Sequence, residues 1–199
     1  MIEAIIFDVG GVYLQGNFYD FINKSYEVLG MLKRKHTDGQ KVVFDQDFNV
    51  GKTTAKECFE KMFGTTLSDD LMQKISRFWT STWTLQPDME DLVRRLKEHN
   101  YTLAILSNSD PVNSPNYEKK GWYAPFKHVV LSHKEGILKP DKRIYEILLE
   151  KLQISAKNCV MIDDQQACLT PAAELGMQVI LYESVPQLEK ELNKLSVKL

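Results

Sequence analysis

Five short apolar runs, each bounded by polar residues, divide the chain. The first is EAIIFD, which ends at Asp8, and four more follow Tyr101: YTLAILS, KHVVLS, NCVMID and QVILY. Short apolar runs that are rich in β-branched residues and lack strict alternation are typical of parallel strands buried on both faces. The pattern therefore predicts a five-stranded parallel sheet.

The segments between these runs have helical periodicity. In PDKRIYEILLEKL, Ile144, Leu148 and Leu152 fall on one face, and TPAAELGM contains Gly176, a residue suited to a helix C-terminus. Strands that alternate with helices predict an α/β fold with a doubly wound parallel sheet. In such a sheet, ligands bind beyond the carboxyl ends of the strands.

Residues 15–88 interrupt the alternation, because they contain helix-like segments and no convincing strand. These segments are residues 18–32, 54–63 and 68–79. Thr54 and Glu57 have the spacing of a capping box, and Ser68 precedes two acids that suit the positive end of a helix dipole. We therefore predict an inserted helical unit at residues 15–88, and a core that combines residues 1–14 with 89–199.

The insert has enough large apolar residues to form a core of its own. We expect it to pack around Phe59, Met62, Leu71, Ile75 and Phe78. Trp79 and Trp83 have two interpretations, since they could line a substrate pocket or fill this helical core. Aromatic residues at such spacing more often pack a core, so we favour the second.

Composition excludes several classes of protein. The 199 residues are 43% hydrophobic, and 25 basic and 27 acidic residues are interspersed to give a net charge of -2. This balance gives no support to a nucleic-acid partner. No apolar run approaches the roughly 18 residues needed to span a bilayer, and no secretory signal is evident, so we expect a cytoplasmic protein without a membrane partner. The oligomeric state cannot be predicted.

Several suggestive features carry little chemistry. Cys58, Cys159 and Cys168 lack metal-ligand spacing, so we expect buried free thiols. NVGKTT, residues 49–54, resembles the end of a nucleotide-binding loop, but Gln46 stands where that motif needs glycine. KRKH, residues 33–36, is expected to be a solvated loop. The four histidines do not support a serine-hydrolase triad, and we expect His133 to lie on the surface.

Polar side chains at the predicted strand ends are more informative. Asp8 follows the first strand and precedes Gly10 and Gly11, where backbone N–H groups can approach an anion. A carboxylate in such a place can act as a nucleophile, although a lone Asp-x-Gly more often caps a turn.

Two further strand ends and a helix start add to this pattern. Ser107 and Asn108 end the next strand, and Lys139 precedes a helix; together they offer donors and positive charge to a phosphate. Asp163 and Asp164 end a further strand and suit a hard cation.

This ordered set resembles the haloacid dehalogenase superfamily from Ile2 to about Tyr182. The matching motifs are FDVGGV, LAILSNSD, GILKPDKRIYEIL and VMIDDQQACLTPAAELGM. The resemblance implies a Rossmann-like core with an inserted cap, and a magnesium-dependent phosphatase acting on a small phosphate ester.

The resemblance also implies a role for each residue. Asp8 would attack phosphorus, and Ser107 and Lys139 would hold the phosphoryl oxygens. Asp8, Asp164 and the carbonyl of Gly10 would bind Mg²⁺, with Asp163 supporting the ion through water.

Gly10 departs from the family pattern, which usually has a second aspartate at this position. That aspartate protonates the leaving group, a contribution typically worth about 10²–10⁴-fold in rate. Relatives with an Asp-x-Gly first motif are still classed as phosphatases of small sugar phosphates. We expect the substitution Gly10→Asp to raise turnover, unless the backbone at Gly10 disfavours a side chain.

Two alternatives remain open at this point. A 2-haloacid dehalogenase needs neither a metal nor a leaving-group acid, but Asp163 and Asp164 would repel the charge of a haloacid. A non-catalytic protein that binds Mg²⁺ and an anion would also tolerate Gly10. The sequence does not identify the substrate.

Overall fold

A five-stranded parallel sheet forms the centre of the fold. The computed structural model describes residues 1–30 and 46–199. In spatial order the strands are β5 (His128–Leu131), β4 (Thr102–Ser107), β1 (Ala4–Phe7), β6 (Cys159–Asp163) and β7 (Gln178–Leu181). All neighbouring pairs are parallel. The predicted α/β fold and its five strands are therefore confirmed, with β1 in the middle.

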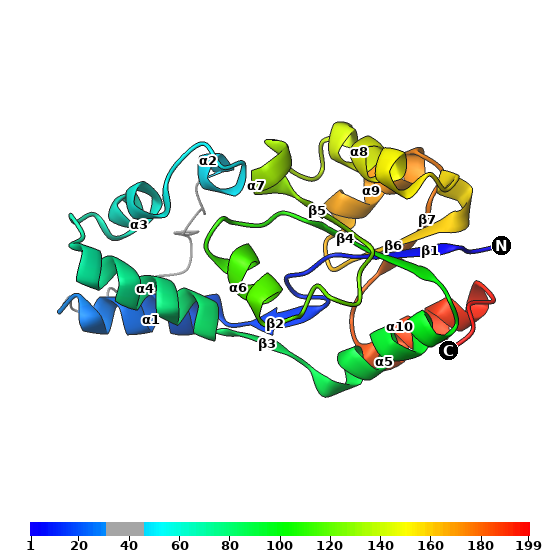
Figure 1. Ribbon diagram of the computed structural model, residues 1–199, viewed down its shortest axis with the longest axis horizontal. Helices are drawn as coiled ribbons and strands as arrows, with labels where there is room; N and C mark the ends of the chain where they lie inside the picture. The colour runs from blue at the N-terminus through cyan, green and yellow to red at the C-terminus, as the bar shows by residue number, and fades with distance from the viewer. Residues whose placement is uncertain (31–45) are drawn as a thin grey trace.

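Helices cover both faces of this sheet (Figure 1). They are α5 (Pro87–Glu98), α8 (Lys142–Leu152), α9 (Gln166–Glu174) and α10 (Val185–Lys194), with a 3₁₀ turn at Ala156–Asn158, while α6 (Asn113–Lys119) and α7 (Ser132–Glu135) lie at the end of the sheet nearer the cap. Alternate residues of β1 face opposite layers: Ile5 and Phe7 pack with α5 and α10, whereas Ala4 and Ile6 pack with α8 and α9. Both faces are buried, which explains the unbroken apolar run.

A second, smaller helical layer lies beyond one end of the sheet (Figure 1). It contains α1 (Phe18–Val28), α2 (Gln46–Asn49), α3 (Ala55–Phe63) and α4 (Asp69–Ser81). Thr54 and Glu57 form the predicted capping box, and Ser68 caps α4. Phe59 and Ile75 are buried among Phe21, Phe48 and other apolar side chains, so this layer has a core of its own. We call it the cap.

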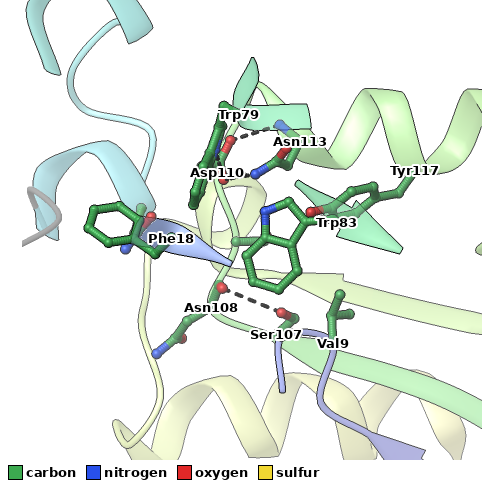
Figure 2. Close-up of a pocket in the computed structure, with 12 residues that line it drawn as sticks. Val9, Phe18, Trp79, Trp83, Ser107, Asn108, Asp110, Asn113 and Tyr117 are labelled. Carbon is green, nitrogen blue, oxygen red and sulfur yellow. Dashed lines mark hydrogen bonds between the residues drawn. The ribbon is translucent and has the colours of Figure 1, made fainter. Parts of the chain in front are cut away.

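A two-stranded antiparallel ribbon connects the cap to the core, which corrects the expectation that residues 15–88 contain no strand. β2 (Leu14–Gly16) pairs with β3 (Trp83–Leu85). Each strand has three residues, too few for a period-two pattern to be recognised. The ribbon spans the predicted boundary at residue 15, and the division into two units stays a prediction. Trp83 lies edge-on to Trp79, with ring centroids 5.8 Å apart (Figure 2).

The cap also touches the core beside α7. The hydroxyl of Ser132 donates to the carbonyl of Asn49 at 2.6 Å. Gly51 lies against the backbone of His133, since a Cβ on this glycine would be 2.6 Å from the carbonyl oxygen. The NVGKTT segment therefore forms a turn that docks on α7, and α2 rather than a strand precedes it, as expected for a segment that is not a phosphate-binding loop.

Other expectations from the sequence have mixed outcomes. Cys58, Cys159 and Cys168 are buried and free, as predicted. The KRKH stretch lies outside the described residues. Among residues 1–30 and 46–199, no helix is both long enough and apolar enough to cross a membrane.

Candidate active site

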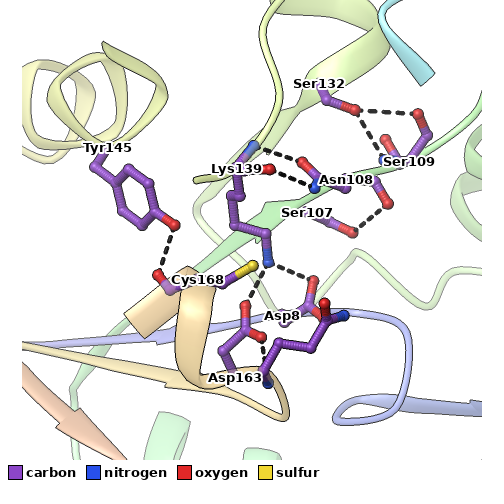
Figure 3. Close-up of polar contacts among 10 residues, drawn as sticks. Asp8, Ser107, Asn108, Ser109, Ser132, Lys139, Tyr145, Asp163 and Cys168 are labelled. Carbon is purple, nitrogen blue, oxygen red and sulfur yellow. Dashed lines mark hydrogen bonds and ion pairs between the residues drawn. The ribbon is translucent and has the colours of Figure 1, made fainter. Parts of the chain in front are cut away.

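A buried lysine joins two carboxylates at the carboxyl ends of the central strands. Lys139 Nζ lies 2.8 Å from Asp8 Oδ1 and 2.6 Å from Asp163 Oδ2 (Figure 3). All three side chains are less than a tenth exposed. Asp8 follows β1 and Asp163 ends β6, and these strands pair in register. The fold thus brings together three residues that are far apart in the sequence.

The loop after β4 fixes the position of Lys139. The side chain of Asn108 donates from Nδ2 to the Lys139 carbonyl at 2.9 Å, and its Oδ1 accepts from the Lys139 N–H at 2.7 Å. The carboxamide of Asn108, predicted as a phosphate ligand, is therefore engaged in holding the lysine backbone. Ser107 ends β4 and is buried, and its hydroxyl makes only a 3.4 Å contact with a neighbouring carbonyl.

Burial and charge act in opposite directions on this cluster. Burial alone would lower the pKa of Lys139, but the carboxylates of Asp8 and Asp163 outweigh it and raise that pKa above its ordinary value. Burial raises the pKa of Asp163 to about 6, although the lysine opposes the shift. The lysine is therefore a fixed cation at neutral pH, and Asp163 is the carboxyl whose ionisation is penalised.

A third carboxylate completes the group. Asp8, Asp163 and Asp164 each place an oxygen within 4.8 Å of the other two. Both oxygens of Asp163 already accept protein donors, from Lys139 and from the Gln165 N–H. Burial and the charge of Asp8 raise the pKa of the Asp164 carboxyl. Three acids held this close favour the binding of a cation.

Gly11 makes room for one of these acids. Its φ of +87° lies in the left-handed region, and a Cβ there would be 2.4 Å from Asp164 Oδ2. A side chain at this position would displace the carboxylate, so the glycine is required both by its conformation and by the close approach.

Gly10 has a different neighbour. A Cβ on Gly10 would lie 3.2 Å from Cη2 of Trp83, and its φ is outside the left-handed region. The obstacle to a side chain at this position is therefore the indole ring, and not the backbone conformation considered in the sequence analysis. The indole of Trp83 would have to move by a few tenths of an ångström to admit a Cβ at position 10.

A pocket of about 220 Å³ adjoins this cluster and lies between core and cap (Figure 2). Gly10, Ser107 and Asn108 are among the residues that line it. Aromatic side chains form its walls: Phe18, Trp79, Trp83 and Tyr117. The preference for core packing is confirmed, since Trp79 is buried in the cap core and Trp83 packs against it, and both tryptophans also line the pocket.

Asp110 also lines this pocket, and the sequence analysis did not identify it. Its Oδ1 accepts from the N–H groups of Val112 and Asn113, and its Oδ2 accepts from Trp79 Nε1 and Asn113 Nδ2. Burial raises the pKa of Asp110, and these four hydrogen bonds oppose the shift. The carboxylate of Asp110 therefore links Trp79 of the cap to the core.

His133 is half-buried, which corrects the expected surface position. Its Nδ1 lies 2.9 Å from Oγ of Ser109, a residue that lines the pocket. Burial lowers the pKa of His133, so the ring is neutral at pH 7. The sequence contains one signal for this environment: His133 closely follows a predicted strand, at the end of the sheet where ligands bind.

Comparison with known proteins decides the family. A family model of haloacid dehalogenase-like hydrolases matches residues 2–176. The chain belongs to this family. The resemblance inferred from four short motifs is therefore confirmed over most of the sequence, and the chain is a haloacid dehalogenase-like hydrolase.

Individual relatives of this hydrolase are distant. A sesquiterpene phosphatase from Aspergillus oryzae is 26% identical over 181 residues, or 88% of this chain and 87% of the relative. A haloacid dehalogenase family enzyme from Bacteroides thetaiotaomicron, solved with magnesium and inorganic phosphate, has a TM-score of 0.74 and 22% identity, covering 92% of this chain and 95% of that chain.

An L-2-haloacid dehalogenase from Xanthobacter autotrophicus, with chloropropionic acid covalently bound, has a TM-score of 0.65 and 16% identity. The match covers 100% of this chain and 85% of that chain. At such identities the two solved structures show a shared fold alone, and the fold accommodates more than one reaction.

Proposed function

We propose that this hydrolase is a magnesium-dependent phosphatase of a small phosphate monoester, acting through an aspartyl-phosphate intermediate. The observation that carries the proposal is the buried Lys139, held between Asp8 and Asp163 beside the oxygens of Asp164. The phosphatase name of the Aspergillus oryzae relative and the magnesium and phosphate in the Bacteroides thetaiotaomicron structure support it.

In this proposal Asp8 is the nucleophile. One of its oxygens forms a bond to phosphorus, and the ester P–O bond breaks, so that the alcohol oxygen leaves with the electron pair and takes up a proton. Water then attacks the acyl phosphate, which releases inorganic phosphate and restores the Asp8 carboxylate. Lys139 supplies fixed positive charge to the phosphoryl oxygens, and the Ser107 hydroxyl donates to them.

The residues present fit a magnesium ion. Three carboxylates whose oxygens lie within 4.8 Å of one another form the hard-oxygen donor set that this ion prefers, and Gly11 leaves space for Asp164. We assign Asp8, Asp164 and the Gly10 carbonyl as ligands, with Asp163 as a supporting group. When bound, the ion would offset the negative charge of the phosphoryl group.

Gly10 provides no acid for the leaving alcohol. The proton must therefore come from solvent or from another group, and a contribution typically worth about 10²–10⁴-fold is absent at this position. Esters of acidic alcohols, which leave without prior protonation, should be the best substrates of the protein. This expectation concerns the rate and leaves the assignment of Asp8 unchanged.

A panel of phosphate esters, assayed with Mg²⁺ and with chelator, tests the proposal. We expect hydrolysis in Mg²⁺ only, and a loss of at least about 10³-fold in Asp8→Asn, because the amide keeps the shape but is no nucleophile. Circular dichroism should show an unchanged fold. Hydrolysis of 2-haloacids in chelator without any phosphatase activity would replace the proposal with a dehalogenase.

A further inference from the structure

A buried hydrogen bond joins the cap to the core at Asp110. This aspartate follows β4 of the core and is 6% exposed, and its Oδ2 accepts from Nε1 of Trp79 at 3.1 Å (Figure 2). Trp79 lies on α4 of the cap and is 4% exposed. The two helices beside this bond, α4 and α6, pack against each other. A carboxylate of the core is therefore covered by an N–H group of the cap.

The two oxygens of Asp110 have different partners. Oδ1 accepts from the backbone N–H groups of Val112 at 2.9 Å and of Asn113 at 2.8 Å, so this oxygen shapes the turn before α6. Oδ2 accepts from Trp79 and, at 3.0 Å, from Nδ2 of Asn113. The bonds of Oδ1 are local and do not need the cap. The bond from Trp79 to Oδ2 exists only while the cap is docked.

The charge and burial of Asp110 strengthen this bond. Burial raises the pKa of Asp110, and its hydrogen bonds oppose the shift. A hydrogen bond to an ionised acceptor is roughly twice as strong as a neutral one, and a buried carboxylate oxygen that loses a donor is costly. Asp110 therefore favours the position of Trp79 that the structure shows.

Trp79 in turn supports the ring beside Gly10. Trp83 packs edge-on against Trp79, and its ring centroid lies 6.5 Å from that of Tyr117. Nε1 of Trp83 is buried and has no hydrogen-bond partner in the part of the chain that the structure describes, so packing alone holds this ring. A displacement of Trp79 would remove one of its supports at Gly10.

We propose that Asp110 is a positioning residue: its Oδ2 holds Trp79, and through Trp79 it holds the docked cap and the Trp83 ring beside Gly10. The effect on turnover rests on the proposed function, whereas the effect on docking does not. Ser107 and Lys139, which we assign to the phosphoryl group, lie on the core. Loss of the hydrogen bond should therefore impair use of the ester and leave the binding of phosphate itself intact.

The substitution Asp110→Asn acts on Oδ2. The amide keeps one oxygen for the backbone N–H groups of the turn and places its NH₂ toward Nε1 of Trp79, where a donor then faces a donor. The same NH₂ would face Nδ2 of Asn113, but Asn113 can rotate its carboxamide, because its Oδ1 is buried and unpaired. The unfavourable contact that remains is the one with Trp79.

Fluorescence quenching measures docking without turnover. The chain has three tryptophans, so a parent protein with Trp83→Phe and Trp122→Phe retains Trp79 as its single indole. We expect Asp110→Asn in this parent to increase acrylamide quenching severalfold, because Trp79 becomes accessible. Asp91→Asn, which replaces an exposed acid on α5, is the control and should leave quenching unchanged. Unchanged quenching in Asp110→Asn would overturn the proposal.

A double-mutant cycle separates the bond to Trp79 from the shape of the turn. In the otherwise native protein, Asp110→Asn should lower kcat/KM for a phosphate ester in Mg²⁺ at least about tenfold, as loss of a hydrogen bond to a charged group does. In Trp79→Phe, which keeps a ring but has no N–H, the same substitution should cost less than about threefold. Inhibition by inorganic phosphate should be unchanged throughout. Equal losses in the two backgrounds would assign Asp110 to the turn alone and overturn the proposal.

Trp79→Phe by itself gives the test from the cap side, with the turn before α6 intact. It should lower kcat/KM and leave inhibition by inorganic phosphate unchanged, and an unaltered kcat/KM would contradict the proposal even if Asp110→Asn did not fold.

The two proposals fail separately. Absence of hydrolysis, with quenching increased in Asp110→Asn, would overturn the phosphatase and keep the role of Asp110 in docking. Hydrolysis that Asp110→Asn leaves unchanged would overturn that role and keep the phosphatase.

Discussion

The candidate site has two halves that are built in different ways. In the charged half, Asp8, Asp163 and Asp164 lie at the ends of paired strands, where the register of the sheet sets their positions, and Lys139 reaches them from the loop before α8. The aromatic half, Phe18, Trp79, Trp83 and Tyr117, comes from the cap, the ribbon and α6, where side chains hold one another.

This difference separates chemistry from selectivity. Asp8, Lys139 and Asp163 are buried and paired with one another, so replacing one of them leaves an uncompensated buried group. Members of the aromatic half contribute area and shape, and such contacts tolerate substitution with a graded loss. We therefore expect substitutions in the charged half to abolish activity, and substitutions in the aromatic half to alter which ester is used.

The largest loss of stability is expected for Lys139→Met. Removing the ammonium leaves Asp8 and Asp163 without their partner, which should destabilise the metal-free protein by about 3–5 kcal/mol and lower turnover by roughly 10²–10³-fold. Thermal unfolding in chelator, and assays with Mg²⁺, measure the two effects. Lys142→Met, on an exposed side chain, is the control. A stable, active Lys139→Met protein would remove the distinction between the halves.

Gly10→Asp tests the contact between Gly10, beside the charged half, and Trp83 of the aromatic half. Alone, the new side chain should press on Trp83, cost about 1–3 kcal/mol of stability and fail to raise turnover. Combined with Trp83→Ala, it should raise turnover above that of Trp83→Ala alone, by up to about 10²-fold, because the acid then has space. A well-folded single variant with higher turnover would show that Trp83 is no obstacle.

In the charged half, Asp163 should make the stability of the metal-free protein depend on pH. The pKa of Asp163 is about 6 in the folded protein and 3.8 ordinarily, so the folded state binds the proton more tightly. The contribution of Asp163 to stability is complete below about pH 4 and is lost as the pH rises through 6, by on the order of 3 kcal/mol. Denaturant unfolding of metal-free protein should show the decline, and it should be smaller in Asp163→Asn.

The smallest effect is expected where the cap docks on the core. Gly51→Ala should destabilise the protein by about 1–2 kcal/mol for its left-handed conformation, with an added loss from contact with the His133 carbonyl. Gly64→Ala is a matched control, because Gly64 has a similar φ and open space around its Cβ position. Equal losses of stability in the two variants would show that docking at Gly51 contributes nothing.

The charged half could be predicted from the sequence because each residue follows a recognisable strand or precedes a helix. Parallel strands bring their carboxyl ends together, so Asp8, Ser107 and Asp163 had to lie near one another once the strands were identified. Lys139 was identified because it precedes a predicted helix, and the family motif implied its role. The bond between its backbone and the Asn108 side chain was not, since no pattern encodes a contact across 31 residues.

The aromatic half could not be predicted in the same way. Trp83 meets Gly10 only because β2 and β3 pair, and three-residue strands leave no periodic signal. Asp110 and Asn113 follow β4 closely, yet their importance depends on Trp79, which arrives from the cap. Packing between the cap and the core depends on the shapes of the side chains that meet there. The hydrophobic pattern predicts only that Trp79 and Trp83 are buried, and not which residues they contact.

The pairing of Gly16 with Trp83 in the ribbon has an evolutionary consequence. A Cβ on Gly16 would lie 2.5 Å from the indole ring, and one on Gly10 would lie 3.2 Å from it. The tryptophan therefore requires small residues at two separate positions, and the three must be inherited as a set. Among homologues, an acid at position 10 should co-vary with a smaller side chain at position 83, and the restriction on position 16 should then be relaxed.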